Sequence, residues 1–584
     1  MDIIQYLHIV PTIALLAIFG RIITKDNFAS SLLSGLLVVS SVIAVTSRYI
    51  PAYNLLIIKV LLAVGVLLFL YEIIKNTKLH ENYIKNNLLI DRNNLIAISA
   101  IALIVTIYLI SFHYQFLPFE SHSVLYFAPS FEILKADYIG NLRVSTHYPS
   151  EFSAMHLIPS AAVSVVGFLN PNPSLAYFTE IRYILAIIFF TNFVYSLYVI
   201  LKPNPWKLFF ICLLVFGIYG EEINYNLYVS SFIYIFVILE IFLRVLKISL
   251  EGKDDNYQRK VLELLFFAVM LIICKAPIFY IAGAFAFYIW WKNKELRFAP
   301  LTIFGGILVL ANIYSWLDIS FISTESIRNA SKFTLKGGFE FKGMIGWSLQ
   351  DSIKDLIELG DRGRKVTGFF ILFYIIAKYY AVFLLINLKG KKFKELQIFD
   401  KSLVIYSVVS LVGILAVRNN EDIGHQAHAY FLMSILSCCA LIVFLLNKNL
   451  DNYIKAALIS TFIIFAMPNK FFGLLLPNRA TFNANNYKYL KYQDADLQST
   501  SQKSYIIKDD EPYWKSELNS QLSGLRINST DTNYIDYGQI RHWIIGAEEK
   551  IVYCPSVLVK CNTDVDLSEE DQGKCEYCKN TDKP

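Results

Sequence analysis

The sequence predicts a polytopic α-helical membrane protein with about fourteen spans and a small polar domain after the last span. Of its 584 residues, 55% are hydrophobic and 17% are charged, and the mean hydropathy is +0.47. Soluble domains carry roughly 25% charged residues, so this composition favours a membrane. The net charge of +6 does not indicate nucleic acid, because Lys and Arg in such a chain set the topology and contact lipid headgroups.

The apolar runs lie close to the ~20 residues needed to cross a bilayer. The first, MDIIQYLHIVPTIALLAIFG, lacks a basic start and a small-residue cleavage site, so we interpret it as a span and not as a signal peptide. Two spans are short, and residues 261–291 could also form one kinked element. We expect spans, each within several residues, at 3–20, 29–47, 54–74, 93–112, 181–201, 207–220, 226–246, 260–274, 276–291, 299–317, 367–387, 402–417, 428–446 and 453–467.

The basic residues predict the orientation, because cytoplasmic loops carry an excess of Lys and Arg. Alternate short loops hold Arg21 and Lys25, Lys75 to Arg92, Lys202 and Lys207, Lys247 to Lys260, Lys292 to Arg297, Lys389 to Lys394, and Lys448. The intervening short loops are poor in basic residues. We therefore expect a multi-pass protein of the inner (cytoplasmic) membrane, with both termini and the long loops 112–181 and 318–366 outside.

The polar C-terminal region, residues 468–584, predicts a small external α/β or α+β domain built from short strands and helices. It follows a membrane domain of residues 1–467, whose second long loop has an amphipathic stretch at 344–359. That stretch could lie on the membrane surface or pack as a lid on the spans.

The eight cysteines form two groups. Four lie in apolar spans and are expected to be buried hydrophobic residues. The other four lie in the C-terminal region, where an oxidising face favours two disulfides over a zinc site or free thiols. The disulfide candidates are Cys554, Cys561, Cys575 and Cys578.

The loop 112–181 is too long and too aromatic for a simple connector, and ordered loops of this length are usually functional. Glu120 and His122 follow the helix-ending Pro118 just outside the predicted membrane. A helix is expected near 129–136, and His147-Tyr148-Pro149 precedes another helix that carries Glu151 and His156. The loop thus places acidic, imidazole and aromatic side chains at a membrane surface.

Three segments of this loop, Phe119–His122, Ser130–Lys135 and His147–Phe152, resemble the GT-C superfamily of integral membrane glycosyltransferases, which includes protein mannosyltransferases and the aminoarabinose transferase of lipid A. In that family an acidic residue just outside a span is followed by membrane-parallel helices and a Tyr-Pro segment. Cys274–Pro277 resembles the family's Lys-Pro hairpin. The chain departs from the family in having about four spans before the loop and a Glu beside a His at the acidic position.

The resemblance implies transfer of a sugar from a polyprenyl-phosphate-linked donor to a glycan, lipid or protein acceptor on the external face. Glu120 would act as general base, with His122 as helper or alternative, since partial desolvation can raise a carboxylate pKa. Cationic side chains would stabilise the departing phosphate. The residues that would bind substrate are Arg143, His147, Tyr148, Glu151, Lys275, Arg418, His425 and His428. Glu120 could instead be a solvated helix-end residue, and Lys275 could only extend from a span end.

The loop around Arg418 is dense in polar side chains, and His425 and His428 would share a helix face. We expect this loop to bind acceptor or phosphate, or to be a hydrated connection. The spacing matches no metal-ligand signature, so the sequence indicates no metal site and leaves a divalent cofactor undecided.

Two further functions stay open. A lipid-linked polysaccharide polymerase or ligase could use the basic residues of loop 318–366. A transporter or flippase of lipid-linked sugars would need charged residues deep within spans. The few candidates lie near span ends or are isolated, which argues against transport: Glu180, Arg182, Glu240, Glu263 and Lys378.

Overall fold

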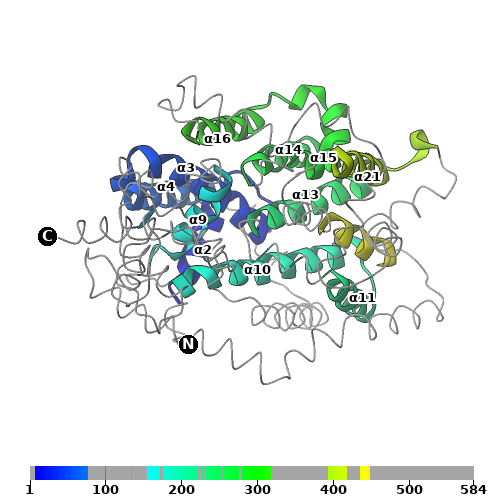
Figure 1. The fold of residues 1–584 in the computed structure, drawn as a ribbon, viewed down its shortest axis with the longest axis horizontal. Helices are drawn as coiled ribbons and strands as arrows, with labels where there is room; N and C mark the ends of the chain where they lie inside the picture. Colours follow the sequence, from blue (N-terminus) through cyan, green and yellow to red (C-terminus); the bar gives the residue numbers. More distant parts are fainter. Residues whose placement is uncertain are drawn as a thin grey trace, which may run out of the picture.

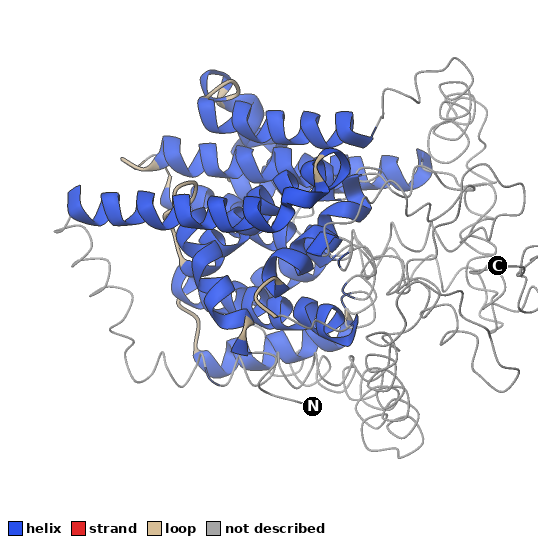
Figure 2. Ribbon diagram, turned by 90° about the vertical axis from the view of Figure 1, so that its left-hand side faces the viewer, coloured by secondary structure: helices blue, strands red, loops and turns tan. Residues whose placement is uncertain are grey.

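The computed structural model describes residues 7–75, 154–170, 175–219, 232–252, 254–274, 279–316, 392–416 and 435–446, together with single residues at 99, 130, 133, 134, 223 and 227. All regular secondary structure in this part of the chain is helical (Figures 1 and 2). The helical fold class predicted from the sequence is therefore confirmed for the described residues. The predicted C-terminal domain, the loop 318–366 and the spans at 93–112 (apart from residue 99), 367–387 and 453–467 lie outside them.

The described helices coincide with predicted spans to within several residues, except α9, which lies in the first long loop. Their bounds are α2 (Ile9–Gly20), α3 (Phe28–Tyr49), α4 (Asn54–Lys75), α9 (Ala154–Gly167), α10 (Leu175–Leu201), α11 (Pro205–Ile218), α13 (Phe232–Glu251), α14 (Tyr257–Cys274), α15 (Phe279–Lys292), α16 (Pro300–Trp316) and α21 (Ile398–Ala416), with short 3-10 turns η1 (Pro51–Tyr53), η4 (Lys294–Leu296) and η6 (Phe393–Glu395). Residues 435–446 are also helical. Because α10 begins at Leu175, the first long loop ends earlier than predicted.

Within the described residues, three helical segments are long and apolar enough to cross a membrane: Phe28–Ser47, Pro51–Lys75 and Ile181–Leu201. They differ in burial. The apolar window of the first is 83% buried, whereas that of the second is 17% buried. Leu67 and Tyr71 of α4 are among the exposed apolar side chains. Helix α3 is therefore a central element, and α4 presents a face suited to lipid.

The helices α16, α14, α13 and α10 lie side by side across the bundle (Figure 1), each packing against the next. Helix α2 packs on α3, and α15 packs on α21. The core between them is made of aliphatic and aromatic side chains, with Phe242 in ring contact with Phe285 and Phe399. These contacts join α13, α15 and α21 into one apolar unit.

Two glycines allow α2 and α3 to cross at close range. A Cβ on Gly20 would overlap the carbonyl oxygen of Ser31, and a Cβ on Gly35 would overlap that of Leu16. The Ser34 hydroxyl donates to the Gly20 carbonyl at 3.0 Å across the same contact. Small residues at helix contacts let backbones approach in this way in membrane proteins.

Helix α9 belongs to the first long loop in the sequence, but it is buried in the bundle. The helix predicted after His147-Tyr148-Pro149 is present, beginning at Ala154. Every residue from Leu157 to Val166 is buried, and the helix packs against α3, α10, α14 and α2. A helix that is hydrophobic nearly all round belongs in a core, so the end of this loop is part of the bundle.

Candidate functional site

The segment at Ser130 in the first long loop is held against α9 by buried hydrogen bonds. The Ser130 hydroxyl donates to the Ser160 carbonyl at 3.1 Å, and the Ser164 hydroxyl donates to the Ser130 carbonyl at 3.2 Å. Ser130, Ser160 and Ser164 are fully buried. Because buried polar groups need partners, this reciprocal pair fixes the position of the segment on α9.

Asn54, the first residue of α4, also holds this segment. Its Nδ2 donates to the Ile133 carbonyl at 3.2 Å and to the Ser47 hydroxyl at 2.9 Å. Its Oδ1 accepts from the Thr46 hydroxyl at 3.0 Å. Asn54 is completely buried. We call the group that joins α3, α4, α9 and the loop the loop anchor: Ser47, Asn54, Ser130, Ile133, Ser160 and Ser164.

The loop anchor lies at the C-terminal end of α3, the end predicted to be external. The residues proposed from the sequence as the site lie outside the described residues, so their roles stay predictions. They are Glu120, His122, Arg143, His147, Tyr148, Glu151, Lys275, Arg418, His425 and His428. The same holds for Cys554, Cys561, Cys575 and Cys578.

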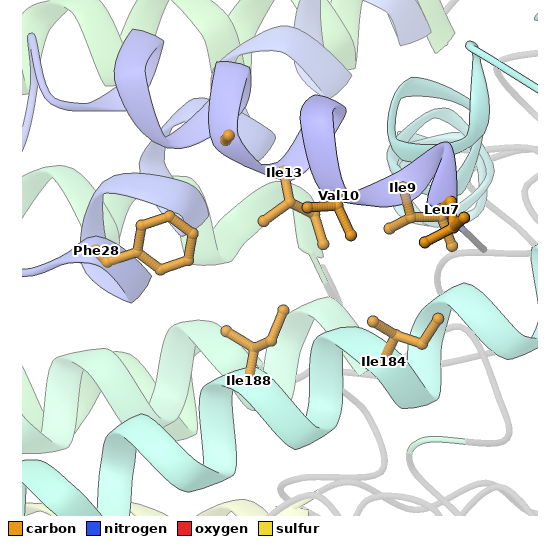
Figure 3. A pocket seen from close by; sticks show the side chains of 8 residues that line it. Leu7, Ile9, Val10, Ile13, Phe28, Ile184 and Ile188 are labelled. Carbon is orange, nitrogen blue, oxygen red and sulfur yellow. The ribbon is translucent and has the colours of Figure 1, made fainter.

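A purely apolar groove runs between α2 and α10 (Figure 3) and encloses about 520 Å³. The side chains of Ile184 and Ile188 point from α10 towards α2 across it. Both walls of the groove, α2 and α10, also pack against α9, so the helix that carries two of the six loop-anchor residues, Ser160 and Ser164, supports the groove as well. The lining residues are Leu7, Ile9, Val10, Ile13, Ala14, Phe28, Ile184 and Ile188.

At the other end of α3, Arg244 lies at the centre of a buried group of charges. Its Nε lies 2.6 Å from Oε1 of Glu240, its Nη1 pairs with Glu263, and Asp26 is 4.0 Å away. The Ser30 hydroxyl donates to Glu240 at 2.8 Å. The side chains of Arg244, Glu240 and Glu263 are 3%, 6% and 4% exposed, so these charges are compensated by one another and not by water.

Two more cations complete this group. Lys247 donates to Asp26 at 2.8 Å, and Arg259 donates to Glu263 at 2.9 Å. Burial of Asp26 acts to raise its pKa, but the positive charges of Arg244 and Lys247 outweigh it and hold the pKa below its usual value. Three carboxylates thus face three cations. We call them the ion cluster: Asp26, Glu240, Arg244, Lys247, Arg259 and Glu263.

The interpretation that the charges within spans are isolated or lie at span ends is wrong for Glu240, which pairs with Arg244. Sequence reasoning missed Arg244, although its i,i+4 spacing from Glu240 in an otherwise apolar helix was a usable signal. Arg182 of α10 is also fully buried, with its guanidinium 4.9 Å from the ring centroid of Tyr183. Charged side chains are therefore more numerous inside the bundle than the sequence indicated.

The cysteines of the spans are buried free thiols, as predicted: Cys212, Cys274, Cys438 and Cys439. Among the described residues, no three His, Cys, Asp or Glu side chains come together as metal ligands. Comparisons with protein-family models, with curated proteins and with solved structures found no match. The functional argument accordingly rests on the residues and their geometry.

Proposed function

We propose that this protein is a membrane glycosyltransferase that moves a sugar from a polyprenyl-phosphate-linked donor to a cell-surface glycan, lipid or protein on the external face. The observation that carries the proposal is that one helix, α9, contacts both the apolar groove and the first long loop. This helix supports both walls of an apolar groove and holds the loop whose residues resemble a glycosyltransferase site. A lipid-linked donor needs those two features next to each other.

The groove suits an isoprenoid chain because its lining is entirely apolar. A chain that moves there from the bilayer gains little from leaving water, since lipid tails are as apolar as the lining. Its benefit is orientation, which brings the phosphate end of the donor to a fixed depth. Holding two reactants in position can lower a barrier by several kcal/mol, on the order of 7–11 at the limit.

The chemistry assigned to the loop is a displacement at the anomeric carbon. The acceptor hydroxyl oxygen forms the new glycosidic bond while Glu120 takes its proton. The bond from the anomeric carbon to the phosphate oxygen breaks, and the lipid phosphate leaves with the electron pair. Arg143, Lys275 and Arg418 are the cations proposed to stabilise that phosphate, and His147 and Tyr148 are proposed to contact the sugar.

The test of the catalytic assignment is Glu120→Gln in protein reconstituted into liposomes with a radiolabelled polyprenyl-phosphate sugar. We expect transfer to a glycan acceptor to be abolished while insertion into the membrane is unchanged. Glu295→Gln, in the exposed η4 turn, is the control and should retain activity. Full activity of Glu120→Gln would refute the mechanism.

The groove is tested separately by Ala14→Trp, which places an indole in it. We expect a higher KM for a long-chain donor and little change for a short-chain donor of the same sugar. Ala63→Trp is the matched control, because Ala63 is an exposed alanine on α4 that does not line the groove. Equal effects of the two variants on KM would contradict a donor-binding groove.

A transporter of lipid-linked sugars is the second candidate, and the ion cluster is the observation that favours it. Buried ionisable groups inside a membrane bundle commonly mark translocation or proton pathways. Movement of a fluorescent lipid-linked sugar across liposomes, with no covalent product, would favour transport over transfer. In that case Arg244→Met should stop the movement, whereas Glu120→Gln should not.

A further inference from the structure

Two segments far apart in the sequence meet at one corner of the bundle, where α15 ends and α21 begins. Helices α15 and α21 lie side by side there (Figure 1). The turns η4 and η6, the residues next to them and the first turn of α21 carry six basic side chains. We call these residues the basic corner: Lys292, Lys294, Arg297, Lys392, Lys394 and Lys401.

Tyr288 is the point on which the two segments converge. The ammonium of Lys292 lies 5.9 Å from its ring centroid, and that of Lys401 lies 5.5 Å away. The ring of Phe393 lies 6.3 Å from that of Tyr288, edge-on. Lys401 also donates to the Lys394 carbonyl at 3.1 Å. Cations from both segments are therefore held around one aromatic ring.

Arg297 fixes a second aromatic platform beside the first. Its guanidinium lies 4.1 Å from the ring centroid of Trp290 and donates to the Trp291 carbonyl at 2.9 Å. Phe298 is 81% exposed, Trp291 53% and Phe393 44%. Exposed aromatic rings next to Lys and Arg are typical of the membrane–water interface.

The cations of the basic corner lack protein counter-ions in the described part of the chain. Elsewhere in that part, Lys25 pairs with Glu72, and Lys260 pairs with both Glu251 and Asp254. No ion pair among the described residues involves a member of the basic corner, although Glu295 and Glu395 lie in the same turns. Within the described residues, the six cations of the basic corner outnumber the carboxylates of these turns, Glu295, Glu395 and Asp400, so the corner carries a net positive charge.

The basic corner lies at the same end of the bundle as the ion cluster. Tyr257, at the start of α14, exchanges hydrogen bonds with Asn293, the residue after α15. Two residues along α14, Arg259 belongs to the ion cluster. Basic loops predict this end to be cytoplasmic, and the cytoplasmic leaflet is the one that carries negative surface charge.

We propose that the basic corner binds the phosphate headgroup of an anionic phospholipid, such as phosphatidylglycerol, in the leaflet at this end of the bundle. The ammonium groups at Tyr288 and the guanidinium at Trp290 contact the headgroup. The exposed rings of Trp291, Phe298 and Phe393 lie in the headgroup region beside it. A lipid fits better than a free phosphate, because those rings would otherwise stay in water.

The test compares lipid retention by the purified full-length protein, measured by native mass spectrometry after exchange into mixed micelles of phosphatidylglycerol and phosphatidylcholine. A lysine near an anionic surface contributes about a fivefold factor in binding. We therefore expect Lys292→Ala with Lys401→Ala to weaken phosphatidylglycerol binding by about five- to thirtyfold. The pair Lys292→Arg and Lys401→Arg should retain it, which separates loss of charge from loss of fold.

Lys59→Ala is the control, because Lys59 is an exposed lysine near the start of α4, at the end of the bundle that is predicted to be external. It should leave retention unchanged. Equal retention of phosphatidylcholine by the wild type would overturn the proposal. So would unchanged retention in the double alanine variant, an equal loss in the control, or competition by millimolar inorganic phosphate that removes the lipid completely.

Discussion

Replacing Arg244 with methionine is the sharpest test of how the bundle is held together. The substitution keeps an unbranched side chain of similar length but removes the charge between Glu240 and Glu263. Both carboxylates stay buried after the change, and within the described part of the chain only Arg259 and the Ser30 hydroxyl remain to contact them. The stacking of the guanidinium over Phe267, 5.1 Å from the ring centroid, is lost as well.

The expected cost follows from that geometry. Removing one partner of a buried ion pair costs about 3–5 kcal/mol, because it leaves an uncompensated buried charge. Folding free energies are themselves about 5–15 kcal/mol. For a large domain about 1 kcal/mol corresponds to roughly 2–4 °C in Tm, so the Tm should fall by about 6–20 °C. Adding Glu240→Gln and Glu263→Gln should recover most of this loss, since no buried charge is then left unpaired.

The assay is thermal unfolding of the detergent-purified protein, followed by intrinsic fluorescence at neutral pH. Lys260→Met is the matched control, because Lys260 also pairs with two carboxylates, Glu251 and Asp254, which are 41% and 38% exposed. Exposed pairs contribute little, so this variant should match the wild type within error. An unchanged Tm for Arg244→Met would refute the reasoning, as would a triple variant no more stable than the single one.

Three further predictions use the same unfolding assay. The pKa of Asp26 is lowered in the folded protein, so the stability that its carboxylate contributes is present above about pH 4 and is lost as the pH falls through the folded pKa. The Tm deficit of Asp26→Asn should therefore shrink in acid. A deficit that does not change with pH would contradict this. Gly20→Ala should cost about 1–3 kcal/mol by forcing α2 from α3, whereas Gly306→Ala, with nothing within 4 Å of its Cβ, should be neutral or slightly stabilising. Asn54→Leu should cost about 1–3 kcal/mol by leaving the buried Ile133 carbonyl without its donor and should lower transfer activity more than membrane insertion; normal activity would separate the loop anchor from the site.

The helices could be predicted from the sequence because the period and length of apolar runs report directly on spans. Asn27, whose side chain accepts from the Ser30 amide at 2.8 Å, caps α3 where a span was expected to begin. The start of α10 was placed at residue 181 because the acidic Glu180 comes just before the apolar run, although the helix begins at Leu175. Arg182, which lies inside the predicted span and is fully buried, shows that a charged residue need not end a helix in this bundle.

The ion cluster could not be predicted from the sequence for a different reason. Its members come from three separate segments, and Asp26 lies 218 positions before Arg244 in the printed sequence. Only the local pairs, Glu240 with Arg244 and Arg259 with Glu263, follow from i,i+4 spacing. The convergence of α3, α13 and α14 at one end is a property of packing, and no pattern within a single helix encodes it.

In the candidate site, too, the sequence indicated which residues are polar but not which residues come into contact. Polar residues in the loop 112–181 indicated chemistry, but nothing in the sequence indicated that Ser130 would bond to α9 or that Asn54 would hold the Ile133 carbonyl. Those contacts join residues 30 and 79 positions apart. The residues assigned to catalysis, Glu120 and His122, stay predictions because they lie outside the described part of the chain.

The two ends of α3 are held in the bundle by different kinds of polar contact. Its 22 residues span about 33 Å at 1.5 Å per residue, close to the hydrocarbon thickness of a bilayer. One end carries the ion cluster, which clamps α3, α13 and α14 by paired charges. The other carries the loop anchor, in which neutral hydroxyl, amide and carbonyl groups hold the Ser130 segment of the first long loop against α4 and α9. That support adds no anion of its own to compete with the donor phosphate of the proposed function for its cations.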